Sequence, residues 1–177
     1  MALTRRMFAQ LVASALLLRH LPALAQTPLT VAVGGSPGPN ITQRVVSAGA
    51  PADMLLLAVA PEKLVGLSSF DLSRQTAIPF HDDIRALPKL GRLAGRASTL
   101  SLEALLALKP DLVGDCGNAD ETWLSQARQV SAQTHIPWLL INGELRHTPG
   151  QLHAAGEALG VVSRTAMQAA LARSEER

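Results

Sequence analysis

Residues 91–118, GRLAGRASTLSLEALLALKPDLVGDCGN, decide the fold. The segment opens with a basic, glycine-containing loop and continues with hydroxyl residues at 98–101 that favour the start of a helix. Leucines then recur at helical spacing until Pro110, which ends the helix because proline lacks the backbone N–H. The short apolar run 111–115 predicts a buried strand that opens into a polar loop. A loop, helix, strand and loop in this order form half of a parallel α/β unit, in which ligands bind beyond the carboxyl ends of the strands.

The rest of the chain alternates short apolar runs with helical patterns in the same way. Strands are expected at 29–33, 44–47, 64–67 and 135–141, and further helices at 51–59 and 120–131. From Thr148 a long helix is expected to run towards Arg177, interrupted only weakly by two glycines. The sequence therefore predicts an α/β fold, with a Rossmann-like parallel sheet, flanking helices and a long C-terminal helix.

Two of these helices carry expectations about single side chains. In the helix at 51–59, the inner face is expected to hold Met54, Leu55 and Ala58. In the helix before Pro110, Lys109 is expected in the last turn, where a cation interacts favourably with the helix dipole.

Residues 1–25 have the features of an export signal. The stretch Thr4–Leu11 contains two adjacent arginines followed by Met and Phe, and it resembles the twin-arginine export motif. An apolar run at 11–18 and the small-x-small triplet at 23–25 follow, as in a signal-peptidase cleavage site. The apolar run is too short to span a bilayer. We expect a mature chain that begins at Gln26 in the periplasm, with a signal for the general secretion route as the alternative.

Composition narrows the function classes. The 177 residues suffice for one ordinary domain, and the formal net charge of +2 becomes −1 once the three arginines of the expected signal are removed. The chain therefore lacks the basic field that nucleic acids require. Aromatic residues are also scarce, with three Phe, two Trp and no Tyr. Because Cys116 is the only cysteine, no internal disulfide can form.

The candidate ligand-binding residues all lie in loops that follow predicted strands or precede the helix near 101. They are Gly49, Ala50, Pro51, Ser69, Phe70, Arg96, Cys116, Asn118 and Asn142. Arg96 offers a planar fork of donors for an anionic group, although it could instead brace its loop against Asp115. Phe70 could stack on a flat ligand or simply pack in the loop, and the asparagines could bind ligand or shape turns.

The sequence gives little support for a metal site or for a catalytic site. His81, Asp82 and Asp83 adjoin one another, but no second histidine stands at a metal-ligand spacing. Catalysis by Cys116 would need a base, and nothing places His135 or His147 beside it. No nucleophile elbow, phosphate loop or dinucleotide fingerprint occurs either. We therefore expect no enzyme activity, no metal site and no resident cofactor.

Four segments together carry a family resemblance. Ser101–Val113, SLEALLALKPDLV, is similar to a characteristic segment of the periplasmic substrate-binding proteins of ABC importers for iron siderophores, haem and cobalamin. The resemblance runs from about Gln43 to the C-terminus, and includes QRVVSAGAPAD at 43–53, APEKLVGLSSF at 60–70 and HIPWLLING at 135–143. Such proteins have two α/β lobes joined by one long helix, with ligand held between the lobes.

The resemblance implies a division of this chain and a role for one further residue. It assigns 26–148 to an N-terminal ligand-binding lobe and 149–177 to the start of the interlobe helix, with the second lobe absent. The chain is thus expected to be truncated, split or a piece of a longer product. By its place in the segment, Glu103 would dock the lobe onto the membrane permease, although the helix dipole alone also explains a first-turn glutamate.

The resemblance further implies a function. The chain is expected to be a monomeric periplasmic solute-binding component that captures a ferric siderophore and delivers it to the ABC permease in the inner membrane. Haem or cobalamin binding is the alternative within the family. A one-lobed interaction module without a transport role is a second alternative, and an enzyme that uses Cys116 is a third.

Overall fold

The structure is a computed structural model that describes residues 28–35, 38, 41–74, 80–93, 98–144 and 147–175. The expected export signal at 1–25 and the candidate Arg96 lie outside these residues.

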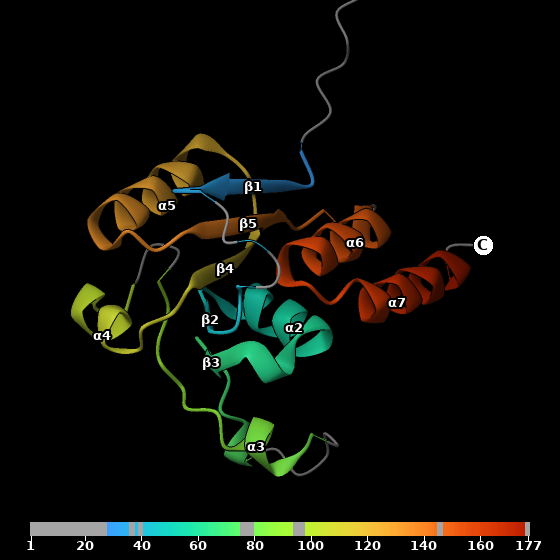
Figure 1. Ribbon diagram of the computed structural model, residues 1–177, viewed down its shortest axis with the longest axis horizontal. Helices are drawn as coiled ribbons and strands as arrows, with labels where there is room; N and C mark the ends of the chain where they lie inside the picture. Colours follow the sequence, from blue (N-terminus) through green and yellow to red (C-terminus); the bar gives the residue numbers. More distant parts are fainter. Residues whose placement is uncertain are drawn as a thin grey trace, which may run out of the picture.

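A five-stranded sheet forms the centre of the described structure, with strand order β1-β5-β4-β2-β3 (Figure 1). The strands are β1 (Thr30–Val33), β2 (Val45–Ser47), β3 (Leu64–Gly66), β4 (Leu112–Gly117) and β5 (Trp138–Asn142). The last four strands run parallel to one another, as expected. The edge strand β1 differs, because it pairs with β5 in the antiparallel direction, with Thr30 opposite Ile141. The prediction of an α/β lobe is confirmed, with one antiparallel edge.

Helices cover both faces of this sheet. They are α2 (Ala50–Val59), α3 (Asp82–Arg85), α4 (Leu102–Ala107), α5 (Glu121–Thr134), α6 (Thr148–Leu159) and α7 (Val162–Glu175), with short 3-10 turns at Pro61–Lys63 and Leu72–Arg74. In Figure 1, α6 and α7 lie beside α2, whereas α4 and α5 lie on the opposite side of the strands.

Two apolar cores lie on the two faces of the sheet. β4 shows the division, because side chains of a strand alternate between faces: Leu112 belongs to one core and Val113 to the other. The Leu112 core includes side chains of α2, α6 and α7, and the Val113 core includes side chains of α4 and α5. We call them the α2-side core and the α5-side core.

Side-chain caps fix where α4 and α5 begin. The Ser101 hydroxyl accepts a hydrogen bond from the Ala104 backbone N–H at 3.1 Å, and the Asp120 carboxylate accepts one from the Trp123 N–H at 3.0 Å. Each bond satisfies an N–H that has no partner within its helix. The placement of Lys109 in the last turn of α4 is wrong, because this residue has a φ of 49° and lies beyond the helix end. 

The expected inner face of α2 is also wrong in part. Met54 is 66% exposed and Ala58 is exposed, whereas Asp53 and Leu56 are buried. A carboxylate occupies an inward position because it accepts hydrogen bonds from the loop after β3. Periodicity alone assigns Asp53 to the solvent side, and the helix is therefore rotated relative to the sequence-based expectation.

The C-terminal segment is a helical hairpin instead of one long helix. Gly160 adopts φ 69° and ends α6, and α7 folds back against it. Arg164 of α7 donates from Nη1 to the Val59 carbonyl at 2.8 Å and pairs with Glu62 at the same distance. These contacts hold α7 against the end of α2, so the chain turns where a single helix was expected.

Candidate functional site

The carboxyl ends of the parallel strands meet at one edge of the sheet, and the described candidate residues lie there. Gly49 precedes α2 directly after β2, Phe70 follows β3, Asn118 follows β4, and Asn142 ends β5. We call residues 48–51, 68–70, 116–118 and 142–143 the strand-exit rim. The remaining described candidates, Ala50, Pro51, Ser69 and Cys116, also belong to it.

Asp53 organises one side of this rim, and sequence reasoning missed it. Its buried carboxylate accepts hydrogen bonds from the backbone N–H groups of Ser68 at 2.8 Å, Ser69 at 2.8 Å and Phe70 at 3.3 Å. It also accepts one from the Ser68 hydroxyl at 3.0 Å. A single side chain of α2 thus fixes the backbone of the loop that carries Ser69 and Phe70. The sequence signal that could have revealed this role is Asp53 itself, the one acidic residue in the otherwise apolar helix α2.

The rim offers a mixture of exposed and partly covered groups. Asn118 and Pro51 are exposed, and Ser69 and Phe70 are half-buried. Asn142 is buried, and its side-chain oxygen accepts from the Glu144 backbone N–H at 3.3 Å. Asn142 therefore supports its turn, and Asn118 is the asparagine with a side chain open to a ligand. The exposed Met54, one turn into α2, adds an apolar group near this edge.

Asp115, the carboxylate considered as a brace for Arg96, accepts hydrogen bonds from both tryptophans. Its Oδ2 accepts from Trp123 Nε1 at 2.6 Å and from Trp138 Nε1 at 3.3 Å, while Oδ1 accepts from the Cys116 N–H at 2.8 Å. This carboxylate faces the α5-side core and is almost fully buried. Burial raises the pKa of Asp115, although the three hydrogen bonds oppose the shift.

Because its pKa is raised, Asp115 is expected to contribute to the free energy of unfolding in a pH-dependent way. Because the pKa is higher in the folded chain, that contribution is full below the unfolded carboxyl pKa of about 3.9 and is lost as pH rises through the folded pKa. We expect the difference in free energy of unfolding between the parent chain and Asp115→Asn to fall with rising pH, starting near about pH 4. Urea denaturation at several pH values measures this difference. A flat or rising difference contradicts the prediction.

Cys116 lies at the rim but is a poor nucleophile. Burial and the neighbouring Asp115 charge raise the pKa of its thiol to about 11. Since the thiolate is the reactive form, the thiol is largely unreactive at neutral pH. This argues against an enzyme that uses Cys116.

The histidines do not gather into a metal site. His81 precedes α3, and His135 ends α5 at the edge of the sheet opposite the rim. His147 lies 3.3 Å from Glu144, from Nε2 to Oε2. Within the described part of the chain, no group of three or more His, Cys, Asp or Glu side chains could hold a metal ion.

Two charged residues, Arg92 and Glu103, lie outside the rim, in the loop before α4 and in the first turn of α4. The Arg92 side chain is exposed, and its backbone is tied to Thr99: the Arg92 N–H donates to the Thr99 hydroxyl at 3.0 Å. Glu103 is exposed in the first turn of α4. Hydrogen bonds from its own backbone N–H and from Ser101 lower the pKa of Glu103, so this side chain stays ionised at neutral pH.

Comparison with known proteins identifies the fold. The structure matches an ABC transporter solute-binding protein from Sulfurospirillum deleyianum with a TM-score of 0.64 and 20% identity, over 75% of this chain and 42% of that one. It matches a periplasmic haem-binding protein from Pseudomonas aeruginosa with a TM-score of 0.51 and 24% identity, over 75% of this chain and 43% of that one. It also matches a possible iron-binding (periplasmic solute-binding) protein from Staphylococcus epidermidis, with a TM-score of 0.51 and 17% identity, over 72% of this chain and 46% of that one.

These matches define what the chain shares with known proteins. Its α/β sheet and helices have the fold of part of these solute-binding proteins, and the chain spans less than half of their length. The first of these neighbours is named as a solute-binding protein of an ABC transporter and the second as a periplasmic haem-binding protein, and neither is named as an enzyme. No protein-family model matches the sequence, and no curated protein does. Among the described residues, no helix is long and apolar enough to cross a membrane.

Proposed function

We propose that this chain supplies a ligand-binding lobe of a periplasmic solute-binding component of an ABC importer, and that the ligand is an iron complex of the ferric siderophore class. The observation that carries this proposal is the strand-exit rim, where polar and apolar groups from four different strand ends face one edge of the sheet. Ligands of open α/β sheets bind at this edge. The fold match to solute-binding proteins supports the same assignment.

The rim chemistry favours a ligand held without covalent bonds. Ser69 and Asn118 offer hydrogen-bond donors and acceptors, Phe70 offers a half-buried ring, and the Cys116 thiol stays protonated. Such a mixture suits a large organic complex with both polar and apolar surfaces. Arg96 remains the proposed contact for an anionic group of that complex.

Haem is the second candidate ligand. The half-buried Phe70 gives the rim apolar surface for a flat macrocycle, and the exposed Met54 adds to it from one turn into α2. The match to the Pseudomonas aeruginosa protein supports this alternative.

Titration of the purified chain with a ferric siderophore, haemin and cyanocobalamin separates these ligands. Each absorbs visible light, and we expect a saturable absorbance change and a thermal shift with the ferric siderophore. Asn118→Ala should weaken binding by about tenfold or less, because one polar contact contributes about 1 kcal/mol. His135→Ala, at the opposite edge, is the matched control. Saturable binding of haemin alone would select the second candidate, and binding of none of the three would reject the proposal.

We further propose that Glu103 docks the lobe onto basic residues of the permease. Glu103→Gln should leave ligand affinity unchanged and weaken association with permease reconstituted in nanodiscs by about threefold to tenfold, since an exposed ion pair contributes up to about 1 kcal/mol. Co-sedimentation measures this association. Glu157→Gln, an exposed glutamate of α6, is the control. Equal loss of association in both variants would argue against a specific role for Glu103.

A further inference from the structure

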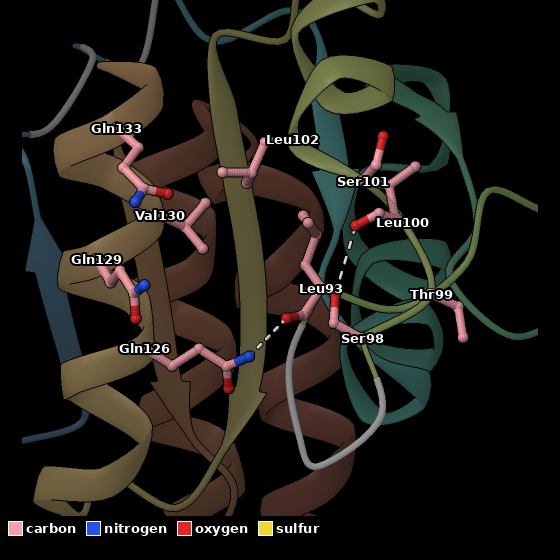
Figure 2. Close-up of a pocket in the computed structure, with 10 residues that line it drawn as sticks. All are labelled: Leu93, Ser98, Thr99, Leu100, Ser101, Leu102, Gln126, Gln129, Val130 and Gln133. Atoms are coloured by element: carbon pink, nitrogen blue, oxygen red, sulfur yellow. Dashed lines mark hydrogen bonds between the residues drawn. The ribbon is translucent and has the colours of Figure 1, made fainter.

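A second candidate site lies away from the rim, on the side of the sheet covered by α5. A groove of about 440 Å³ runs between α5 and the segment that leads into α4 (Figure 2). We call it the α5 groove. It is lined by Leu93, Ser98, Thr99, Leu100, Ser101, Leu102, Gln126, Gln129, Val130 and Gln133. The volume falls within the range of roughly 300–1,000 Å³ that is typical of small-molecule sites.

The groove has a row of amides on one wall. Gln126, Gln129 and Gln133 stand three and four residues apart along α5, and this spacing places them on one helix face. Figure 2 shows them on the same side of the groove. The Gln126 side chain donates to the Leu93 carbonyl at 2.9 Å and so ties the helix to the opposite wall. Within the described residues, the exposed amides of Gln129 and Gln133 have no hydrogen-bond partner.

Hydroxyl groups stand on the other wall. Ser98 donates to the Arg92 carbonyl at 3.0 Å, which leaves its lone pairs available to a ligand donor. The Ser101 hydroxyl accepts from the Ala104 N–H and hydrogen-bonds the Glu103 carboxylate, so it is held in place at the edge of the groove. Between the walls, Leu93, Leu100 and Val130 form an apolar floor that belongs to the α5-side core. The floor thus lies across the sheet from Phe70 and Cys116, which pack on the α2-side core.

The lining selects against charged ligands. None of the lining residues carries a charge, so a phosphate, carboxylate or ammonium group would lose hydration without gaining a counter-charge. Amides and hydroxyls both donate and accept hydrogen bonds, as the hydroxyls of a sugar do. An apolar floor suits the C–H face of a sugar ring. We propose that the α5 groove binds a neutral, polyhydroxylated small molecule of the monosaccharide or amino-sugar class.

This site is independent of the proposed importer function, because it shares no residue with the strand-exit rim. The test is a ¹H–¹⁵N NMR titration of the whole chain with glucose and with N-acetylglucosamine. We expect saturable shifts of the side-chain amide signals of Gln129 and Gln133 with at least one sugar in the millimolar range. Glucose 6-phosphate, the charged counterpart, should bind more weakly than glucose.

Two variants sharpen the test. Gln129→Ala combined with Gln133→Ala should weaken sugar binding by about tenfold or more, because two hydrogen bonds of about 1 kcal/mol each are lost. Ser125→Ala, an exposed residue of α5 outside the groove, should leave the affinity unchanged. The proposal is overturned if neither sugar gives saturable shifts, if the shifts map to the rim, or if the double variant binds as tightly as the parent chain. The titration of the parent chain decides the matter even if the double variant fails to fold.

Discussion

Replacing Asp53 by alanine is expected to lower the free energy of unfolding by about 3–5 kcal/mol. The variant removes the acceptor of three backbone N–H groups and one hydroxyl, of which the two donors of Ser68 are buried and those of Ser69 and Phe70 are half-buried. A domain of this size has a total stability of about 5–15 kcal/mol, so the loss is a large fraction of it. Urea denaturation followed by tryptophan fluorescence measures the change.

The same variant should affect the rim more than the rest of the sheet. Because Asp53 fixes the loop that carries Ser69 and Phe70, we expect faster amide hydrogen exchange at 68–70 than in β4. Asp83→Ala, an exposed carboxylate of α3, is the matched control and should change stability by less than about 0.5 kcal/mol. A loss below about 1 kcal/mol for Asp53→Ala would mean that water replaces the carboxylate.

Gly156→Ala is expected to destabilise the chain by about 1–3 kcal/mol, although alanine favours helices. A Cβ atom at this position would lie 1.9 Å from Thr165 Oγ1 and 2.9 Å from Thr165 Cβ, and Thr165 is fully buried. The two helices would have to separate. If residues 148–175 formed one continuous helix, the same change would instead stabilise it by about 1 kcal/mol. The sign of the effect therefore distinguishes the hairpin from a single helix.

A double-mutant cycle tests the contact behind this prediction. Thr165→Ala removes Oγ1 and Cγ2, two of the three atoms that a new Cβ would meet. Gly156→Ala combined with Thr165→Ala should therefore cost less than the sum of the two single changes. Thermal or urea unfolding of all four chains gives the coupling energy. Additive costs would show that the residues do not touch in solution.

Several helices, strands and caps could be predicted from the local sequence alone. The run of leucines before Pro110 predicted α4, and the apolar residues from Leu112 predicted β4, because spacing and chain breakers act within a few residues. Helix starts were expected among the hydroxyl residues at 98–101 and near residue 120, and the structure shows which residues act as the caps: Ser101 and Asp120. Placing the candidate residues at strand ends needed only the alternation of strands and helices, since parallel strands bring those ends to one edge.

Other features depend on partners distant in the sequence. The inward turn of Asp53 depends on donors fifteen to seventeen residues away. The antiparallel edge strand β1 depends on pairing with β5, and the position of α7 on α2 depends on Arg164 reaching Val59 and Glu62. The α5 groove joins residues from two segments that are separated by a strand.

The sequence by itself determined the order of the five strands and of α2, α4 and α5, the starts of α4 and α5, and the edge of the sheet at which the described candidate residues lie. Tertiary structure alone decided the role of Asp53, the hairpin of α6 and α7, the pairing of both tryptophans with Asp115, and the α5 groove. The physical reason is the distance along the chain over which each interaction acts. Helix and turn preferences act between neighbours, whereas a buried carboxylate or a close helix contact is favourable only when distant segments supply its donors and its space.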